Sequence, residues 1–470
     1  MSAAPQPGWL PDLLYLGGRF QSGVAMFADP HGRIARFSSL PGDLRMARRL
    51  SNKALLPGLV NAHSHSFQRA IRARTEHRTG PGRDSFWTWR QAMYRAANRL
   101  SPQDLFDVAR MAFLEMLASG ITTVGEFHYL HHAPDGTPYA HRNLLAETLI
   151  RASADVGIRL ALLRAAYARA GFQTPPHPGQ ARFLTPRVED FLADTEQLLS
   201  CVANSSPPFR AWLGVAPHSI RALPLPYLLA VAEFARKRRL VLHMHVAEQP
   251  AEVEACQAEF GLRPVELLHQ RGILNARFTA VHAIHLAERE VECLAQARAH
   301  ICACPTTERN LGDGVAPAQL WAAANLSVCF GTDSNIQIDL LEDARQLEYH
   351  LRLERLERAV LASGEDPESL AKRLFAGATQ AGAASLGAPA GSLQEGLAAD
   401  FFTVALDDLS IAGAGPDSLL AHIVFSAGRS AVRDVFVAGR PVLEDGHHPL
   451  RHEIVRRFQD LQRRLWSEGS

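Results

Sequence analysis

Two histidines, one residue apart, end an apolar run in the segment LPGLVNAHSHSFQRA, residues 56–70. His63 and His65 would share a face of an extended strand, because side chains at positions i and i+2 point to the same side. Two neutral imidazoles on one face can bind a single ion, and histidine is the commonest metal ligand in proteins. The alternative for this segment alone is that two polar residues begin a loop.

Further polar side chains follow other short apolar runs along the chain. These residues are Glu126, His128, Arg164, His218, His245, Glu248, His282 and Asp333. A single member such as His128 is typical of a buried structural histidine. Several imidazoles together with a carboxylate are different, because three or more nitrogen and oxygen ligands with an open position describe a catalytic metal site. Their joint placement at the ends of apolar runs predicts such a site.

The apolar runs themselves predict the fold. Eight of them are typical of buried strands: LLPGLVNAH, ITTVGEF, IRLALLRAA, AWLGVAP, LVLHMHVA, FTAVHA, AHICACP and LSVCFGTD. Amphipathic segments lie between most of them, such as residues 101–120, where Ser101 can cap a helix that Gly120 ends. Eight such units predict an α/β fold with a (β/α)8 barrel of the TIM type, with a doubly wound sheet as the alternative. Active sites of such barrels lie at the C-terminal ends of the strands, where the polar residues stand.

Composition excludes several classes of partner. The 470 residues include 49 Lys and Arg against 48 Asp and Glu, a formal charge of +1, which argues against binding to nucleic acid or an anionic membrane. Six cysteines without regular spacing do not indicate a disulfide scaffold. The N-terminal segment lacks a basic region, and no apolar run approaches the ~20 residues of a membrane span. We therefore expect a cytoplasmic protein with a small-molecule substrate.

Four motifs resemble the amidohydrolase superfamily of metal-dependent hydrolases. They are HSH after the first strand, HMHVAE on the fifth, VHA on the sixth and GTDS on the eighth. The resemblance covers nearly the whole chain and implies a barrel over residues 56–394. It also implies a small β-sandwich domain built from both chain ends, residues 1–55 and 395–450, with hairpin turns at DPHG and AGRP. A C-terminal helix is expected over residues 451–470.

The resemblance also implies a metal site. It assigns four ligands to one divalent ion: His63, His65, His245 and Asp333. Zn²⁺ is the expected ion, with Fe²⁺ and Mn²⁺ as alternatives, because these ligands accept all three. Binuclear members of the superfamily bridge two ions through a carbamylated lysine or a carboxylate. None of the chain's three lysines lies at the end of a barrel strand, and Glu126 follows the second strand, so we expect one ion per chain.

The ligand set resembles the deaminase branch, in which a glutamate stands three residues after the histidine of strand five. That residue is Glu248 here. A bound Zn²⁺ lowers the pKa of its water from 15.7 toward ~7, which supplies hydroxide for attack at neutral pH. Asp333 is expected to accept the proton of that water, and Glu248 to pass it to the departing nitrogen. His282 is expected to polarise the carbon under attack.

Three segments resemble formimidoylglutamate deiminases, the iminohydrolases of histidine degradation. They are DSFWTWRQAMY (84–94), GEFHYLHH (125–132) and APHSIRA (216–222). The resemblance implies substrate contacts from Gln68, Arg90, Tyr129, His218 and Arg221. Two carboxylates on the substrate suit arginine forks, which make charge-assisted bidentate contacts. The expected reaction is hydrolysis of N-formimidoyl-L-glutamate to N-formyl-L-glutamate and ammonia, and the expected assembly is a homodimer.

Three other functions remain open. A deaminase of a purine or related heterocycle could use the same ligands, but it would need stacking and amide contacts in place of Arg90 and Arg221. A second possibility is another acidic substrate, such as a formimino-aspartate or an N-acyl amino acid. The third is a non-catalytic barrel used for binding or assembly, which should have lost metal ligands, whereas this chain retains all of them.

Overall fold

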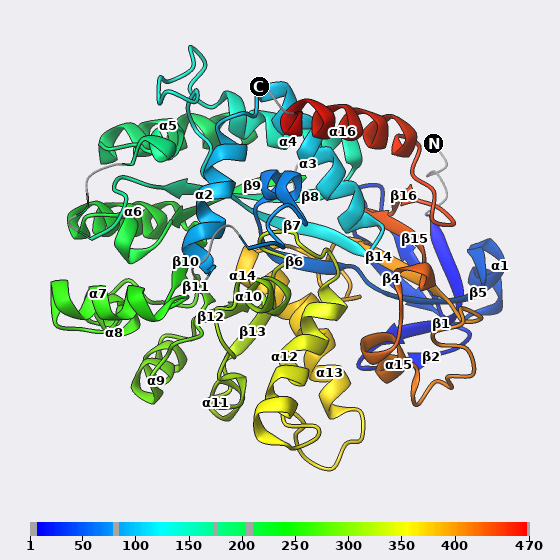
Figure 1. The fold of residues 1–470 in the computed structure, drawn as a ribbon. Coiled ribbons are helices and arrows are strands. Elements are labelled where there is room, and N and C mark those ends of the chain that lie inside the picture. Colours follow the sequence, from blue (N-terminus) through cyan, green and yellow to red (C-terminus); the bar gives the residue numbers. More distant parts are fainter. Residues whose placement is uncertain (1–6, 79–83, 173, 175–176, 204–209, 468–470) are drawn as a thin grey trace.

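The computed structural model describes residues 7–78, 84–172, 174, 177–203 and 210–467. Eight parallel strands follow one another in chain order around a barrel (Figure 1). They are β6 (Leu59–Ser64), β7 (Ile121–His128), β8 (Arg159–Ala166), β9 (Ala211–Pro217), β10 (Leu242–Val246), β11 (Phe278–His282), β12 (His300–Ala303) and β13 (Ser327–Phe330). Each lies within or overlaps one of the eight predicted runs.

The barrel is closed by backbone hydrogen bonds at Asp333. The amide of Asp333 donates to the carbonyl oxygen of His63 over 3.0 Å, and the amide of His65 donates to the carbonyl oxygen of Asp333 over 2.9 Å. The closure needs a residue without a side chain at position 331, because a Cβ on Gly331 would lie 2.6 Å from the Cβ of His63. These hydrogen bonds join the end of the eighth strand to the end of the first at His63, His65 and Asp333, three of the predicted metal ligands.

Helices surround the barrel strands (Figure 1). The longer ones are α2 (Phe86–Ala97), α3 (Pro102–Leu117), α4 (Leu144–Val156), α5 (Val188–Ala203), α6 (Leu225–Arg238), α7 (Pro250–Phe260), α9 (Glu288–Gln296), α12 (Leu340–Arg355) and α13 (Ser369–Ala376). The shorter ones are α8 (Pro264–Gln270), α10 (Pro305–Leu311), α11 (Ala318–Ala323), α14 (Gly382–Leu386) and the turns η1 (Ser66–Ile71), η2 (Pro178–Phe183), η3 (Ile220–Ala222) and η4 (Gly377–Ala381).

The helix predicted within residues 101–120 is confirmed as α3. The side chain of Ser101 accepts from the amide of Asp104, and the Asp104 carboxylate accepts from the amide of Ser101, which satisfies two free donors of the first turn. The helix ends at Leu117, and Gly120, with φ +82°, makes the turn into β7.

A second sheet of eight strands uses both ends of the chain. Its strands are β1 (Gly8–Leu16), β2 (Arg19–Gln21), β3 (Ala25–Ala28), β4 (Ile34–Ser38), β5 (Arg48–Pro57), β14 (Phe401–Ala405), β15 (Val432–Val437) and β16 (Arg440–Leu443). Two short helices, α1 (Pro41–Met46) and α15 (Leu419–Phe425), and the turn η5 (Arg429–Ala431) accompany it. The rings of Trp9, Phe401 and Phe436 pack with centroids 4.4–5.6 Å apart. The predicted fold class is confirmed, and the predicted domain boundaries stay predictions.

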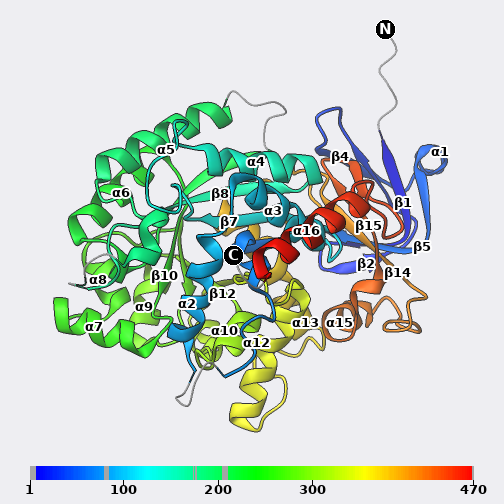
Figure 2. The ribbon, with the colours of Figure 1, turned by 45° about the horizontal axis from the view of Figure 1, so that its top comes forward.

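The C-terminal helix α16 (Arg451–Trp466) lies along α3, as Figure 2 shows. Ion pairs join the two helices, from Arg110 to Glu453 over 3.0 Å and from Arg457 to Asp107 over 2.8 Å. Within the described part of the chain, no helix combines the length and apolar character needed to cross a lipid bilayer.

Candidate active site

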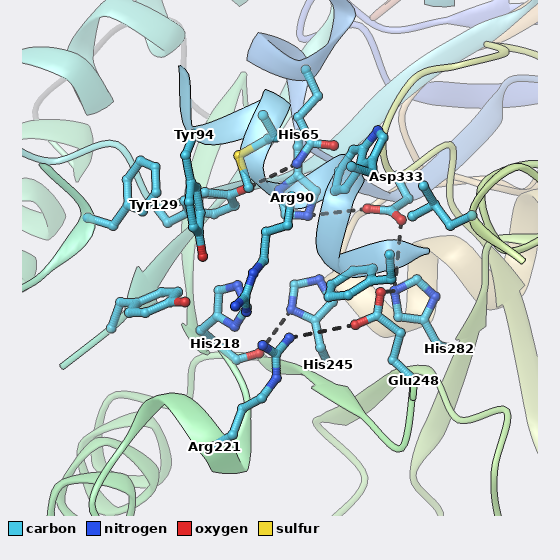
Figure 3. A pocket seen from close by; sticks show the side chains of 17 residues that line it. His65, Arg90, Tyr94, Tyr129, His218, Arg221, His245, Glu248, His282 and Asp333 are labelled. Atoms are coloured by element: carbon cyan, nitrogen blue, oxygen red, sulfur yellow. Dashed lines mark hydrogen bonds and ion pairs between the residues drawn. The ribbon is translucent and has the colours of Figure 1, made fainter. Parts of the chain in front are cut away.

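Three histidines and an aspartate converge at the C-terminal ends of the barrel strands. His63 and His65 come from the first barrel strand and its end, His245 from β10, and Asp333 follows β13. One ligand atom of each lies within 4.8 Å of those of the others, and all four residues are buried. Oδ1 of Asp333 lies 3.2 Å from Nε2 of both His63 and His65, and Nε2 of His245 lies 3.2 Å from Nε2 of His63. The structure thus brings together the four residues predicted as metal ligands, of which Figure 3 labels His65, His245 and Asp333.

The outer ring nitrogens orient two of these imidazoles. Nδ1 of His65 lies 2.8 Å from the carbonyl oxygen of Phe127, and Nδ1 of His245 lies 2.9 Å from that of His218. Each Nδ1 can donate its hydrogen there, which leaves each Nε2 facing the common centre, where its lone pair would bind an ion. Burial lowers the pKa of His63 to about 3, so this ring is neutral. Neutral imidazoles around one carboxylate are the donor set of a divalent metal, and the four residues fit such an ion.

Asp333 is held as an anion in a strained backbone. Burial would raise its pKa, but the hydrogen bonds with His63 and His65 outweigh that effect and hold the pKa of Asp333 well below its usual range. Its φ of +43° is rare for a residue with a side chain. Asn335 supports this turn, because its Nδ2 donates to the carbonyl oxygen of His65 over 3.0 Å. Strain of this kind clusters at functional sites.

Glu248 and His282 stand beside the four converging residues. Nε2 of His282 lies 3.8 Å from Oε1 of Glu248 and 3.8 Å from Oδ2 of Asp333. Burial raises the pKa of Glu248, opposed in part by His282 and by Arg221, whose guanidinium lies 3.8 Å from its Oε2. The two predicted proton-transfer and polarising residues therefore face the same point as the converging ligands.

A carboxylate that was not predicted from the sequence orients His282. Oε1 of Glu308 accepts from Nδ1 of His282 over 3.2 Å and from the amide of Cys304 over 2.8 Å. Burial alone would lower the pKa of His282, but Glu248 and the hydrogen bond to Glu308 raise it to about 10. Glu308 lies in the first turn of α10, directly after the seventh barrel strand. A carboxylate so close to a strand end was the signal that could have identified it.

We expect Glu308→Ala to lower kcat by about 10- to 100-fold with little change in KM and unchanged metal content. The physical reason is the loss of a hydrogen bond to a charged group, about 1.5–3 kcal/mol, at a ring that is predicted to polarise the carbon under attack. Glu308→Gln keeps an acceptor oxygen and should recover part of the activity. Steady-state kinetics of both variants tests this, and an unchanged kcat in Glu308→Ala would show that Glu308 is not needed to orient His282.

The five predicted substrate residues line one pocket with His65, His245 and Asp333. Nε2 of Gln68 donates to the hydroxyl of Tyr129 over 2.8 Å. The guanidinium of Arg90 lies 4.5 Å from the ring centre of Trp87, and its Nε and Nη1 are buried without a hydrogen-bond partner among the described residues. Figure 3 shows Arg90 and Arg221 on the side of the pocket opposite Asp333. The pocket therefore has cationic groups at one side and the converging ligands at the other.

Aromatic residues that were not predicted complete the pocket wall. Phe86, Trp89 and Tyr94 come from α2, and Tyr167 and Phe183 follow β8. Nε2 of Gln180 donates to the hydroxyls of both Tyr94 and Tyr167, over 2.8 and 2.6 Å. These hydrogen bonds join α2 to the loop after β8 across the pocket.

Two strand-end residues have roles outside the pocket. Oε1 of Glu126 accepts from the amide and the hydroxyl of Ser66, over 2.7 and 2.6 Å, and so holds the turn that follows His65. His128 lies next to Arg164 in the pairing of β7 with β8, and neither residue lines the pocket. Among the described residues, Glu126 is not part of a group of possible metal ligands.

Comparison with known proteins agrees with this geometry. Residues 54–442 match the model of the Amidohydrolase family. The chain is 39% identical over 409 residues to formimidoylglutamate deiminase of Pseudomonas aeruginosa, covering 86% of this chain and 88% of the relative. It is 30% identical over 385 residues to 8-oxoguanine deaminase of the same organism, covering 81% and 80%. The crystal structure of an amidohydrolase from Brucella melitensis superposes with a TM-score of 0.89 at 36% identity, covering 98% of this chain and 100% of that one. The chain belongs to the amidohydrolase family.

Proposed function

We propose that the protein hydrolyses N-formimidoyl-L-glutamate to N-formyl-L-glutamate and ammonia, a step of histidine degradation. The observation that carries the proposal is a pocket with Arg90 and Arg221 at one side and His65, His245 and Asp333, which converge with His63, at the other. A dicarboxylate with a formimidoyl group at one end matches both sides. The similarity to a protein named formimidoylglutamate deiminase supports the same reaction.

The metal in this proposal is one divalent ion per chain, Zn²⁺ by preference. His63, His65, His245 and Asp333 would hold it, and when bound it supplies a Lewis acid that lowers the pKa of a coordinated water. Fe²⁺ and Mn²⁺ suit the same ligands.

We expect elemental analysis to find about one tightly bound divalent ion per active chain. The reason is that Glu126, the carboxylate considered as a bridge, is engaged by Ser66, and that none of the chain's lysines lies at the end of a barrel strand. Removal of the metal with a chelator should abolish turnover, and adding back Zn²⁺ should restore it. Two tightly bound ions per active chain would contradict the mononuclear site.

The chain's own residues supply proton transfer. Water adds its oxygen to the formimidoyl carbon, the bond from that carbon to the terminal nitrogen breaks, and a carbonyl remains. Both protons of the water end on the terminal nitrogen. Asp333 accepts one from the attacking water and Glu248 passes it to that nitrogen, and the second follows from the hydroxyl group as the carbonyl forms, so that the nitrogen leaves as ammonia. His282, held by Glu308, lies where it stabilises charge on the reacting group.

Gln68, Arg90, Tyr129, His218 and Arg221 would position the substrate in this proposal. Arg221 and Arg90 bind the two carboxylates, which fixes the distance between these anchors and the reacting carbon. The aromatic walls exclude water from that space, and low local dielectric strengthens each ionic contact.

Arg221→Ala should lower kcat/KM by at least ~10-fold and leave the metal in place. Loss of a hydrogen bond to a charged group costs about 1.5–3 kcal/mol, and more if a carboxylate is left buried. A neutral analogue that lacks one carboxylate should react slowly with the wild type, and this penalty should shrink in Arg221→Ala. An equal penalty in both proteins would show that Arg221 does not bind that carboxylate.

Ammonia release over a panel of formimino, guanidino and heterocyclic compounds tests the proposed substrate class. The second candidate is a deaminase of a purine or related heterocycle, which the pocket's aromatic walls and the 30% identity to 8-oxoguanine deaminase favour. A formimino-aspartate belongs in the panel because it carries the same charges on a shorter chain. Preference for an uncharged heterocycle would replace the proposed function with the second candidate.

We further propose that the protein acts as a homodimer in the cytoplasm. Twofold assemblies are the commonest among soluble oligomers. Light scattering of the purified chain tests the assembly, and a monomeric mass at micromolar concentration would contradict it.

A further inference from the structure

A second cavity lies where the two hairpin turns singled out in the sequence meet the barrel. Its volume is about 490 Å³. The turn DPHG (29–32) and the residues 438–440 of the turn AGRP line it, together with Arg159 and Arg210. Arg159 begins β8 and Arg210 directly precedes β9, so the cavity lies at the N-terminal ends of barrel strands, whereas the converging histidines lie at the C-terminal ends.

The rim of this cavity is held rigidly. The amide of Ala399 donates to the carbonyl oxygen of Gly32 over 2.9 Å, and the amide of Gly439 donates to that of Ala399 over 2.8 Å. Gly32 has φ +76°, and a Cβ on it would collide with the backbone of Ala438. The two turns, about 400 residues apart in the chain, are thus locked to each other.

The cavity has an excess of positive charge. Arg159 is neutralised by Asp400, with contacts of 2.5 and 3.1 Å. Arg210 and Arg440 then stand against one lining carboxylate, that of Asp29.

Arg210 and Arg440 have no carboxylate paired with their positive charge among the described residues. In the part of the chain that the structure describes, the guanidiniums of Arg210 and Arg440 have no hydrogen-bond or ion-pair partner. Burial and the neighbouring guanidiniums of Arg440 and Arg159 lower the pKa of Arg210, which shows that the like charges repel one another. An anion between Arg210 and Arg440 would remove this repulsion.

We propose that this cavity binds a small organic dianion, a phosphate monoester or a dicarboxylate, through Arg210 and Arg440. The guanidinium fork suits either anionic group, because it donates two parallel hydrogen bonds. The cavity's volume falls within the ~300–1,000 Å³ typical of small-molecule sites, which leaves room for an organic body beyond the charged group. Pro30, Pro389 and Ala398 provide apolar wall for that body. Because the cavity lies at the opposite end of the barrel strands from the active-site pocket, this ligand would bind apart from the substrate.

Isothermal titration calorimetry of the full-length, metal-loaded protein tests the site with two probes at fixed ionic strength, phenyl phosphate and glutarate. We expect saturable binding of at least one probe, and the tighter one identifies which dianion the cavity prefers. The double variant Arg210→Gln/Arg440→Gln should bind at least tenfold more weakly. Arg221→Ala, which weakens anion binding only in the active-site pocket, should retain the binding that the double variant loses.

A matched control removes two exposed charges elsewhere, Arg19→Gln/Arg45→Gln, and should bind like the wild type. The double variant should unfold at the same temperature as the wild type or higher without ligand, because repulsion between Arg210 and Arg440 is removed. The proposal is overturned if neither probe binds, if the control weakens binding as much as the double variant, or if only Arg221→Ala abolishes it.

Discussion

Replacement of a converging ligand should abolish both metal binding and turnover. His63→Ala and Asp333→Ala each remove one of four donors from a site that has few to spare. Asp333→Ala should be the more severe, because the same carboxylate also accepts the proton of the attacking water in the proposed mechanism. We expect activity to fall to the background of the assay, with metal content well below one ion per chain.

The measurement is elemental analysis of each purified variant alongside its rate of ammonia release. His128→Asn is the matched control, because it replaces a buried histidine at a strand end that does not line the pocket. The control should retain metal and turnover. If Asp333→Ala or His63→Ala kept a full complement of metal, the assigned ligand set would be wrong.

Glu248→Gln should keep the metal and lose turnover by ~10²-fold or more, the scale of a general acid–base group. The amide preserves the shape of the side chain and its contacts with Arg221 and His282, but it cannot carry a proton to the departing nitrogen. The loss should appear in kcat, since Arg90 and Arg221, the proposed anchors of the substrate carboxylates, are unchanged.

Glu252→Gln is the control for this variant. Glu252 is also buried and lies in the first turn of α7, four residues after Glu248. Burial raises its pKa to about 7. It does not line the pocket with the converging ligands, so its variant should keep most of its activity. Near-normal activity in Glu248→Gln would make Glu248 a structural residue and assign proton delivery to another group.

The barrel could be predicted because its strands are short, apolar and separated by amphipathic segments. Parallel strands that are buried on both faces are short continuous apolar runs, which differ from the spaced apolar residues of an amphipathic helix. The C-terminal ends of these strands meet at one rim of the barrel. That rule alone places His63, His245 and Asp333 together although they are far apart in the chain. The motifs shared with a known superfamily then assign roles that spacing cannot.

Other parts of the site depend on contacts that local sequence does not encode. Glu308 reaches His282 only because β11 and β12 are neighbours in the barrel. Tyr94 and Tyr167 meet through Gln180, a residue with no motif of its own. The second cavity arises in the same way: both of its turns were predicted from the sequence, but the contact between them runs through Ala399, which hydrogen-bonds to both Gly32 and Gly439.

The most direct test of the proposed reaction is to identify its products. The formimidoyl carbon carries two nitrogens, and hydrolysis can release either of them. Loss of the terminal nitrogen gives N-formyl-L-glutamate and ammonia, whereas loss of the substituted nitrogen gives glutamate and formamide. Proton nuclear magnetic resonance of the reaction of metal-loaded protein with N-formimidoyl-L-glutamate, combined with an ammonia assay, distinguishes the two. We predict one equivalent each of N-formyl-L-glutamate and ammonia, with kcat/KM above that for 8-oxoguanine or adenosine. Formation of glutamate and formamide, or faster deamination of either heterocycle, would contradict the proposed reaction.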